Sequence, residues 1–124
     1  MPGMAETTAH THHGIDYVEL TVTDLAAAKR FYAEAFGWEF TDYRPEYAGI
    51  RRGSGDAGGL RLDAEPPRPG GPLVLLFSGD LDRTVAAVRA AGGQVTAGPY
   101  EFPGGRRFHF RDPSGNELGV WSET

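Results

Sequence analysis

The sequence of 124 residues contains no cysteine and no long apolar run, and its basic residues do not cluster. Without cysteine there is no disulfide framework and no thiol nucleophile. The 12 lysines and arginines are outnumbered by 17 aspartates and glutamates, and a net charge of −5 argues against binding to the phosphate backbone of nucleic acid. No segment approaches the roughly 20 apolar residues of a membrane helix, and no signal-peptide core follows Met1. We therefore expect a cytoplasmic protein that binds neither nucleic acid nor membrane, and its acidity favours a cationic ligand.

Glycine and proline are abundant, with 18 and 9 residues, which is typical of a strand-rich chain with short connections. Hydrophobic residues make up 40% of the sequence, enough for the core of one domain of this length. Residues 1–13 are small and polar and lack any period, so we expect a disordered N-terminal arm. Residues 14–124 are predicted to form a single domain.

After residue 13, the hydrophobic patterns of the sequence predict the same order of strands and helix twice. Residues 15–22 alternate as a strand, and an amphipathic helix follows, with Asp24 as its N-cap and Gly37 at its end. The other predicted elements are strands at 38–43, 47–52, 59–63, 73–78, 94–102, 106–111 and 116–121, a capped helix at 79–93 and a proline-rich linker at 64–72.

An internal repeat follows from this order, because superposing Asp24 on Asp80 also superposes Gly37 on Gly93 without a gap. Each half is a strand–helix–strand–strand–strand module, so the predicted class is α+β, with one helix on the outer face of each sheet. The two free sheet faces would meet across a cup, where a ligand would bind. The modules would span about residues 14–66 and 70–124.

The C-terminal hairpin can be predicted in more detail. A turn at residues 112–116 would place Arg111 opposite Glu117 and His109 opposite Gly119. Alternation then directs Arg107, His109, Glu117 and Trp121 toward the cup, and their neighbours toward the helices. We expect His109 to lean across the space that Gly119 leaves. A register slip of one residue would abolish this arrangement.

Three segments of the sequence are YVELTVTDLAAAKRFYAEAFGWEF, GDLDRTVAAVRAAGGQV and FPGGRRFHFRDPSGNELGVW. Together they resemble the vicinal oxygen chelate superfamily of glyoxalases, bleomycin-resistance proteins and extradiol dioxygenases, most of all the branch related to lactoylglutathione lyase. The resemblance implies paired βαβββ modules and, commonly, a divalent metal held in the cup by histidine and glutamate. It also implies a homodimer, because a second chain completes the cup in many relatives.

The resemblance places metal ligands at four positions of this sequence. Three of them hold Tyr17, Leu73 and Gly119, which are rare or absent among the ligands of divalent metals. The fourth falls near Arg61 and Asp63. We therefore expect the usual metal site to be absent, with Gly119 as a ligand position without its ligand.

Two other uses of the polar cup residues remain open. Glu19, His109 and Glu117 could form a replacement site for Zn, Mn, Ni or Fe, since imidazole with two carboxylates suits these ions. Alternatively, Glu19 and His109 could act as a metal-free acid–base pair, or the carboxylates could simply line the cup. The enzyme hypothesis is thus a lyase or isomerase acting on a small oxygenated metabolite. A dioxygenase fits less well, because no iron triad is visible.

The alternative hypothesis is a binding protein that sequesters an antibiotic or toxin without metal, as the resemblance to bleomycin-resistance proteins implies. An aromatic and acidic lining can stack on a planar cation. Both hypotheses require a small-molecule ligand. The predicted ligand-binding residues are Tyr17, Tyr47, Leu75, Phe77, Arg107, Glu117 and Trp121.

Overall fold

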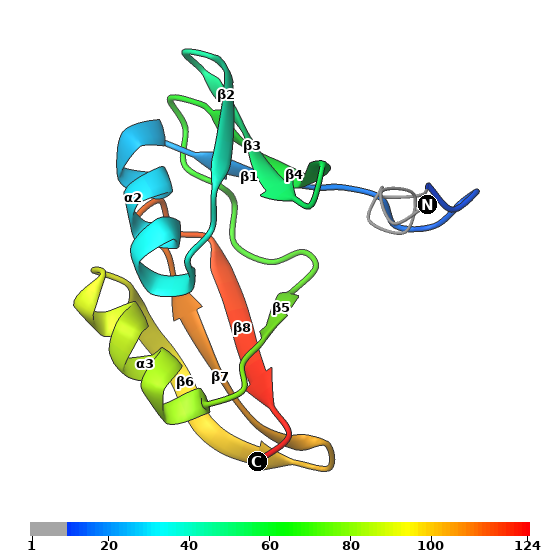
Figure 1. Ribbon diagram of the computed structural model, residues 1–124. Helices are drawn as coiled ribbons and strands as arrows, with labels where there is room; N and C mark the ends of the chain where they lie inside the picture. Colours follow the sequence, from blue (N-terminus) through cyan, green and yellow to red (C-terminus); the bar gives the residue numbers. More distant parts are fainter. Residues whose placement is uncertain (1–9) are drawn as a thin grey trace.

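Two helices and eight strands form the part of the chain that the structure describes, residues 10–124 of a computed structural model (Figure 1). The first module contains β1 (Val18–Val22), α2 (Leu25–Phe36), β2 (Phe40–Arg44), β3 (Tyr47–Arg52) and β4 (Gly55–Leu62). The second contains β5 (Val74–Phe77), α3 (Leu81–Ala90), β6 (Gln94–Phe102), β7 (Gly105–Arg111) and β8 (Glu117–Ser122). The predicted α+β class and the repeated order of elements are confirmed.

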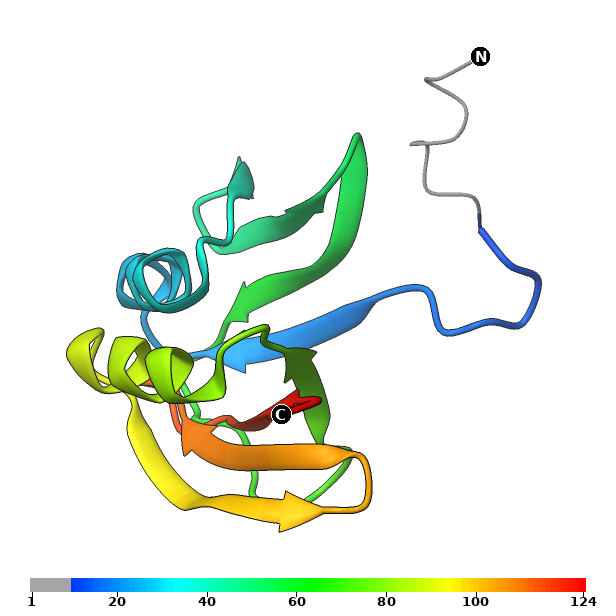
Figure 2. The ribbon, with the colours of Figure 1, turned by 60° about the horizontal axis from the view of Figure 1, so that its bottom comes forward.

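The two modules form four-stranded mixed sheets of the same topology. The strand orders are β1-β4-β3-β2 and β5-β8-β7-β6. In each sheet the first and last strands of the module pair in parallel, and the other pairs are antiparallel. Helices α2 and α3 contact each other on one side of the molecule (Figure 2). Each sheet therefore keeps one face turned away from the helices.

The helix ends follow the sequence signals. The Asp24 carboxylate accepts a hydrogen bond from the Ala27 amide at 2.9 Å, which satisfies one of the unpaired donors of the first turn. Gly37 ends α2 with φ of 74°, a left-handed conformation that glycine adopts without steric cost. The Asp80 carboxylate caps α3 in the same way, accepting from the Arg83 amide. Among residues 10–124, neither helix has the length and hydrophobicity needed to cross a membrane.

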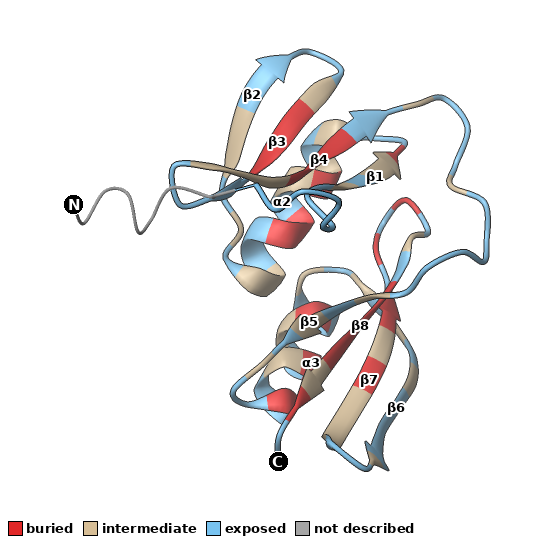
Figure 3. Cartoon of the chain, turned by 90° about the vertical axis from the view of Figure 1, so that its right-hand side faces the viewer, coloured by how far each residue is buried: buried red, intermediate tan, exposed pale blue. Residues whose placement is uncertain are grey.

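A hydrophobic core cluster contains residues of both modules, and Figure 3 shows buried positions in both of them. Phe31 and Tyr32 of α2 are buried in the same cluster as the apolar face of α3 and the inner face of the second sheet. The second-module members of this cluster are Leu81, Val85, Val88, Phe108, Phe110, Leu118 and Val120. Because helix α2 shares this core, the second sheet is held in place by side chains of both modules.

The predicted turn at residues 112–116 is closed by local hydrogen bonds. The Asp112 carboxylate accepts from the amides of Ser114 and Asn116 at 2.9 and 3.0 Å. It also accepts from the Tyr32 hydroxyl of the first module at 2.7 Å, which the sequence did not predict. Burial, together with the Asp112 charge and this hydrogen bond, raises the pKa of Tyr32 well above its usual value.

Further hydrogen bonds from the same turn reach β1 and its end. The Ser114 hydroxyl accepts from the Thr23 amide at 2.9 Å, and the Asn116 side-chain amide donates to the Thr21 carbonyl at 2.8 Å. We call this set of contacts, made by Asp112, Ser114 and Asn116 with the first module, the inter-module latch. The turn thus has a structural role, and it acts between modules as well as locally.

The predicted N-terminal arm falls mostly outside the described residues. Residues 10–13 are exposed, and the Nδ1 atom of His10 lies 2.5 Å from a carboxylate oxygen of Asp16. Hydrogen bonding with Asp16 raises the pKa of His10.

Candidate functional site

The predicted register of the C-terminal hairpin is confirmed. Arg111 lies opposite Glu117, and His109 lies opposite Gly119. Phe108 and Phe110 point toward the helices and are fully buried. The opposite face of this sheet, which we call the C-terminal face, carries Leu75, Phe77, Tyr100, Phe102, Arg107, His109, Glu117 and Trp121.

Aromatic side chains and one guanidinium group form a row across all four strands of the C-terminal face. Phe77 pairs with Trp121, Trp121 with Arg107, and Arg107 with Tyr100. The Phe77 and Trp121 rings meet edge to face with centroids 5.1 Å apart, and the Arg107 guanidinium lies 5.6 Å from the Tyr100 ring centroid. Phe102 adds a second ring beside Trp121 and Arg107. We call Phe77, Tyr100, Phe102, Arg107 and Trp121 the aromatic row.

His109 connects the aromatic row to a carboxylate. Its Nδ1 atom lies 3.2 Å from Oε2 of Glu117, and its Nε2 atom lies 3.0 Å from the Tyr100 hydroxyl. The same hydroxyl accepts a hydrogen bond from Nε of Arg107 at 2.5 Å. A carboxylate, an imidazole, a phenol and a guanidinium thus form one continuous hydrogen-bonded chain, which suits proton transfer and ligand orientation.

Tyr100 and Phe102 were not among the predicted site residues, and the irregular pairing of β6 with β7 means that simple alternation does not identify their face. The strand pairing shifts between Ala97 and Tyr100, where β6 has one more residue than β7. This β-bulge includes Gly98, with φ of 82°, and turns Tyr100 onto the same face as His109. The Gly-Pro pair inside a strand was the signal that could have revealed the bulge.

Gly119 provides space for neighbouring side chains, as predicted, and Leu75 comes closer to it than His109 does. A Cβ atom at this position would collide with Leu75 of the neighbouring strand, whereas it would lie 3.7 Å from the His109 ring. The His109 ring thus borders the space above Gly119, and Leu75 occupies most of it. His109 turns toward Glu117 and Tyr100, because both offer hydrogen bonds.

The free face of the first sheet carries a second polar cluster, which we call the N-terminal face cluster: Tyr17, Glu19, Tyr47 and Arg61. The Tyr47 hydroxyl donates to the Glu19 carboxylate at 3.0 Å and is also hydrogen-bonded to the Tyr17 hydroxyl. Arg61 lies 3.5 Å from Glu19. Desolvation, followed by the bonds to Tyr17 and Glu19, raises the pKa of Tyr47, so its hydroxyl stays protonated.

The structure brings together His109 and Glu117 but leaves Glu19 in the other cluster. Within residues 10–124, no group of three His, Asp or Glu side chains is close enough to share a metal ion. At the positions that the resemblance assigns to ligands, Leu73 and Gly119 offer no donor atom, and the Tyr17 hydroxyl is bonded to Tyr47. At three of the four positions, the residues present therefore do not fit the metal that the resemblance implies.

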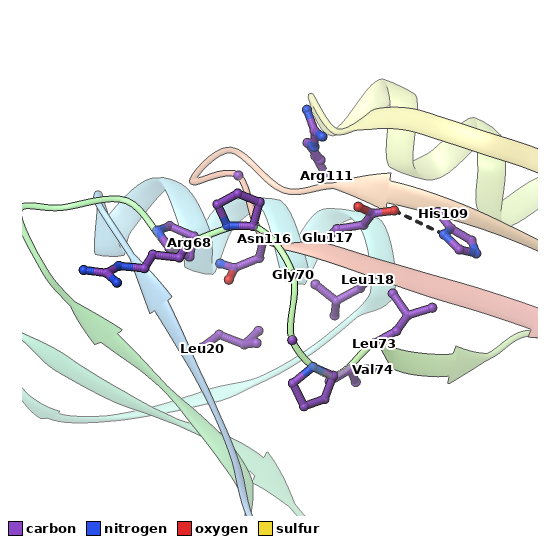
Figure 4. A pocket seen from close by; sticks show the side chains of 15 residues that line it. Leu20, Arg68, Gly70, Leu73, Val74, His109, Arg111, Asn116, Glu117 and Leu118 are labelled. Atoms are coloured by element: carbon purple, nitrogen blue, oxygen red, sulfur yellow. Dashed lines mark hydrogen bonds and ion pairs between the residues drawn. The ribbon is translucent and has the colours of Figure 1, made fainter.

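A pocket of about 500 Å³ opens where the linker between the modules passes over the sheet edges (Figure 4). Residues 67–72 of the linker form one wall, and Leu20, Val74 and Leu118 contribute apolar side chains. Glu117 and His109 line the same pocket, and Figure 4 shows their contact beside it. The hydrogen-bonded chain on the C-terminal face therefore begins in a pocket that is accessible from outside.

Comparison with curated proteins finds relatives that are longer than this chain. The chain is 30% identical over 115 residues to CFP32 of Mycobacterium tuberculosis, which carries a provisional glyoxylase name. It is 31% identical over 124 residues to the anthracycline biosynthesis protein DauV of Streptomyces sp. strain C5. These matches cover 86% and 85% of this chain but only 44% and 45% of the relatives. The chain thus spans less than half the length of either protein.

Among solved structures, a similar one is that of TnmS3, an antibiotic-binding protein from Streptomyces sp. CB03234. It superposes with a TM-score of 0.66 at 29% identity, covering 95% of this chain and 98% of that one. The family model for the Glyoxalase/Bleomycin resistance protein/Dioxygenase superfamily matches residues 14–120, almost the whole described domain. The chain therefore belongs to the glyoxalase/bleomycin resistance protein/dioxygenase superfamily.

Proposed function

We propose that this protein binds a planar aromatic small molecule on its C-terminal face and does so without a metal. The observation that carries the proposal is the aromatic row. Phe77 lies beside Trp121 and is 59% exposed, although the core of the protein buries other large aromatic side chains. Exposed rings with a guanidinium between them can stack on a flat conjugated ligand. The pocket beside Glu117 would receive a polar or cationic substituent of the same ligand.

The names of two relatives support this ligand class. TnmS3 is an antibiotic-binding protein and DauV an anthracycline biosynthesis protein, and anthracyclines combine a planar ring system with a cationic amino sugar. The net charge of −5 and the Glu117 carboxylate suit such a cation. The second candidate function, a lyase or isomerase, is favoured by the chain of hydrogen bonds through His109.

Titration with daunorubicin, an anthracycline, tests the binding proposal. We expect saturable one-to-one binding in the presence of EDTA, reported by quenching of Trp121 fluorescence. Replacing Trp121 with alanine should weaken binding about tenfold or more, because central aromatic anchors contribute most of the binding energy of an interface. The measurement is the dissociation constant by isothermal titration calorimetry, which does not depend on tryptophan.

The matched control is Tyr43→Ala, which removes an exposed aromatic residue from the other sheet. Its dissociation constant should stay within about twofold of the unsubstituted protein, as for a residue outside the interface. Equal affinity of the Trp121→Ala protein, or no saturable binding of daunorubicin and related flat cations, would exclude the aromatic row as the binding surface.

We also propose that the protein is a homodimer. Both free sheet faces expose large side chains, including Tyr17 at 41% and Leu75 at 41%, and contiguous exposed apolar surface marks an interaction site. Sedimentation equilibrium at micromolar concentration should give twice the chain mass of 13.4 kDa. A single species at the chain mass would refute the dimer and leave the C-terminal face open to ligand from one chain alone.

A further inference from the structure

We infer that Tyr100, His109 and Glu117 form a proton-transfer centre in which Tyr100 is the catalytic residue. This inference rests on the proposed function, because the substrate is placed on the aromatic row. It adds a reaction to that function: removal of a proton from an acidic C–H group of a planar conjugated molecule. Arg107 is assigned the role of holding the Tyr100 oxygen.

The directions of the hydrogen bonds follow from the groups involved. A carboxylate only accepts, so the proton between Glu117 and His109 belongs to Nδ1 of the imidazole. In its neutral form this ring has a free electron pair at Nε2, which lies 3.0 Å from the Tyr100 hydroxyl. Tyr100 therefore donates its proton to His109. The order carboxylate, imidazole, hydroxyl is the arrangement by which a histidine activates a hydroxyl group.

The position of Arg107 distinguishes the hydrogen-bonded series Glu117, His109 and Tyr100 from a purely structural network. Its Nε–H group donates to the Tyr100 oxygen, on which negative charge develops when the phenol loses its proton. A fixed cation at this oxygen stabilises the phenolate, just as Glu117 stabilises the imidazolium form of His109. Arg107 and Glu117 thus favour the same charge-separated state, in which Tyr100 is a phenolate and His109 an imidazolium.

On the side of the aromatic row, the phenol of Tyr100 is the accessible group of the centre. The His109 side chain is 16% exposed, because Tyr100 and Glu117 cover its two nitrogen atoms. Tyr100 is 37% exposed and stands in the aromatic row, one strand from Arg107 and two from Trp121. A flat molecule stacked on this row therefore meets the Tyr100 oxygen before it can meet the imidazole.

The β-bulge in β6 gives the arrangement its geometry. Without the extra residue between Ala97 and Tyr100, the tyrosine would point to the helix side of the sheet. Ala97, the residue opposite His109, is small and leaves room for the tyrosine ring to reach the imidazole. The ring centroids of Tyr100 and His109 are 5.8 Å apart. Bulges often re-aim a side chain near an active site, and this one brings the phenol to its base.

The reaction is balanced without an oxidant or a reductant. The Tyr100 proton moves to Nε2 of His109, and the resulting phenolate takes a proton from a carbon of the substrate. The electron pair of that C–H bond moves into the conjugated system, toward an electronegative atom. Return of the proton to a different carbon completes an isomerisation, whereas departure of a leaving group completes an elimination. Both outcomes agree with the lyase or isomerase hypothesis.

The probe is 5-nitrobenzisoxazole, a flat aromatic molecule with one acidic C–H group. Removal of this proton breaks the N–O bond and releases a coloured nitrile phenolate, so absorbance reports the proton transfer directly. In EDTA-containing buffer we expect saturable turnover above the rate in buffer alone. Replacing Tyr100 with phenylalanine should lower kcat about 100-fold with little change in KM, because the ring is retained and only the base is lost.

Two further variants give the inference its controls. Glu117→Gln keeps the size of the side chain but removes the charge that holds the imidazolium, so kcat should fall about tenfold. Tyr43→Phe removes the hydroxyl of an exposed tyrosine that is bonded to Asp56 on the other sheet, and kcat should not change. The far-ultraviolet circular dichroism of each variant reports its folding.

Two results would overturn the inference. One is the absence of turnover above buffer by a protein that binds daunorubicin normally; the binding function would then stand without the reaction. The other is a Tyr100→Phe protein with full kcat alongside an inactive His109→Gln protein, which would make the imidazole itself the base. If the unsubstituted protein does not bind daunorubicin at all, that result contradicts the proposed function itself.

Discussion

Replacement of Asp112 with alanine is expected to lower the free energy of unfolding by about 3 kcal/mol, because the inter-module latch loses its central acceptor. Asp112 is 5% exposed, and its carboxylate accepts hydrogen bonds from Tyr32, Ser114 and Asn116. Without it the fully buried Tyr32 hydroxyl has no acceptor, and each unsatisfied buried donor costs about 1–3 kcal/mol. Urea denaturation followed by circular dichroism measures the loss, which corresponds to a melting temperature lowered by roughly 10 °C.

The variant Asp112→Asn retains one acceptor oxygen and should lose only about half as much stability. A free energy of unfolding of Asp112→Ala within about 0.5 kcal/mol of that of the unsubstituted protein would be typical of a surface substitution. It would mean that the latch does not hold the modules together. The variant Tyr32→Phe identifies the inter-module part of the effect. Tyr32→Phe should lower the free energy of unfolding in the otherwise unsubstituted protein but hardly at all in the Asp112→Ala protein, as expected for two residues in contact.

The raised pKa of Tyr32 predicts a pH dependence for the same contact. In the unfolded chain tyrosine loses its proton near pH 10, whereas in the folded protein Tyr32 keeps it. Above pH 10 the folded state therefore binds more protons than the unfolded state, and the free energy of unfolding falls as the pH rises. The contribution of Tyr32 is complete below pH 10, and the slope above it should be shallower in Tyr32→Phe.

Local rules were sufficient to predict most of the fold. The cap residues Asp24 and Asp80 were identified from the sequence because capping involves amides only three residues away. The register of the last hairpin was predicted because a tight turn and strict alternation leave one pairing that buries Phe108 and Phe110. Each of these features depends on neighbours in the sequence.

The features that escaped prediction depend on an irregular backbone or on distant residues. Tyr100 lies in a strand whose pairing with β7 shifts twice, and the sequence pattern did not reveal these irregularities. The bond between Tyr32 and Asp112 joins residues 80 positions apart, and the sequence alone gives no reason to pair them. Glu19 and His109 were expected to share a cup, but the structure joins each to partners on its own sheet. Their joint catalytic role stays a prediction.

Two glycines, Gly59 and Gly119, leave room on the free sheet faces for large side chains of neighbouring strands. Gly119 lies beneath Leu75, and Gly59 lies beneath the hydroxyl groups of Tyr47 and Tyr17. In both places a glycine replaces a side chain that would point into the face. These two positions in the middle of the sheets are therefore covered by a neighbouring apolar or aromatic residue.

Replacement of Gly58 with alanine is expected to have an effect as large as that of Asp112→Ala, about 3 kcal/mol. A Cβ atom at Gly58 would stand against the carbonyl oxygen of Val18 and 3.0 Å from its carbonyl carbon. These are backbone atoms of β1, which cannot rotate away as a side chain can. Because β1 is an edge strand that pairs only with β4, it has to shift, and Tyr17 and Glu19 shift with it.

The neighbouring variant Gly59→Ala provides the contrast. Its Cβ atom would meet the hydroxyl ends of Tyr47 and Tyr17, and flexible side chains can move away at little cost. We expect a loss of unfolding free energy below about 1 kcal/mol, within the usual range for single substitutions. Daunorubicin binding on the C-terminal face should be unchanged in Gly59→Ala, because that face belongs to the other sheet. Equal stability of the two alanine variants would mean that β1 is held more loosely than its pairing indicates, and a loss of daunorubicin binding in Gly59→Ala would place the ligand across both faces.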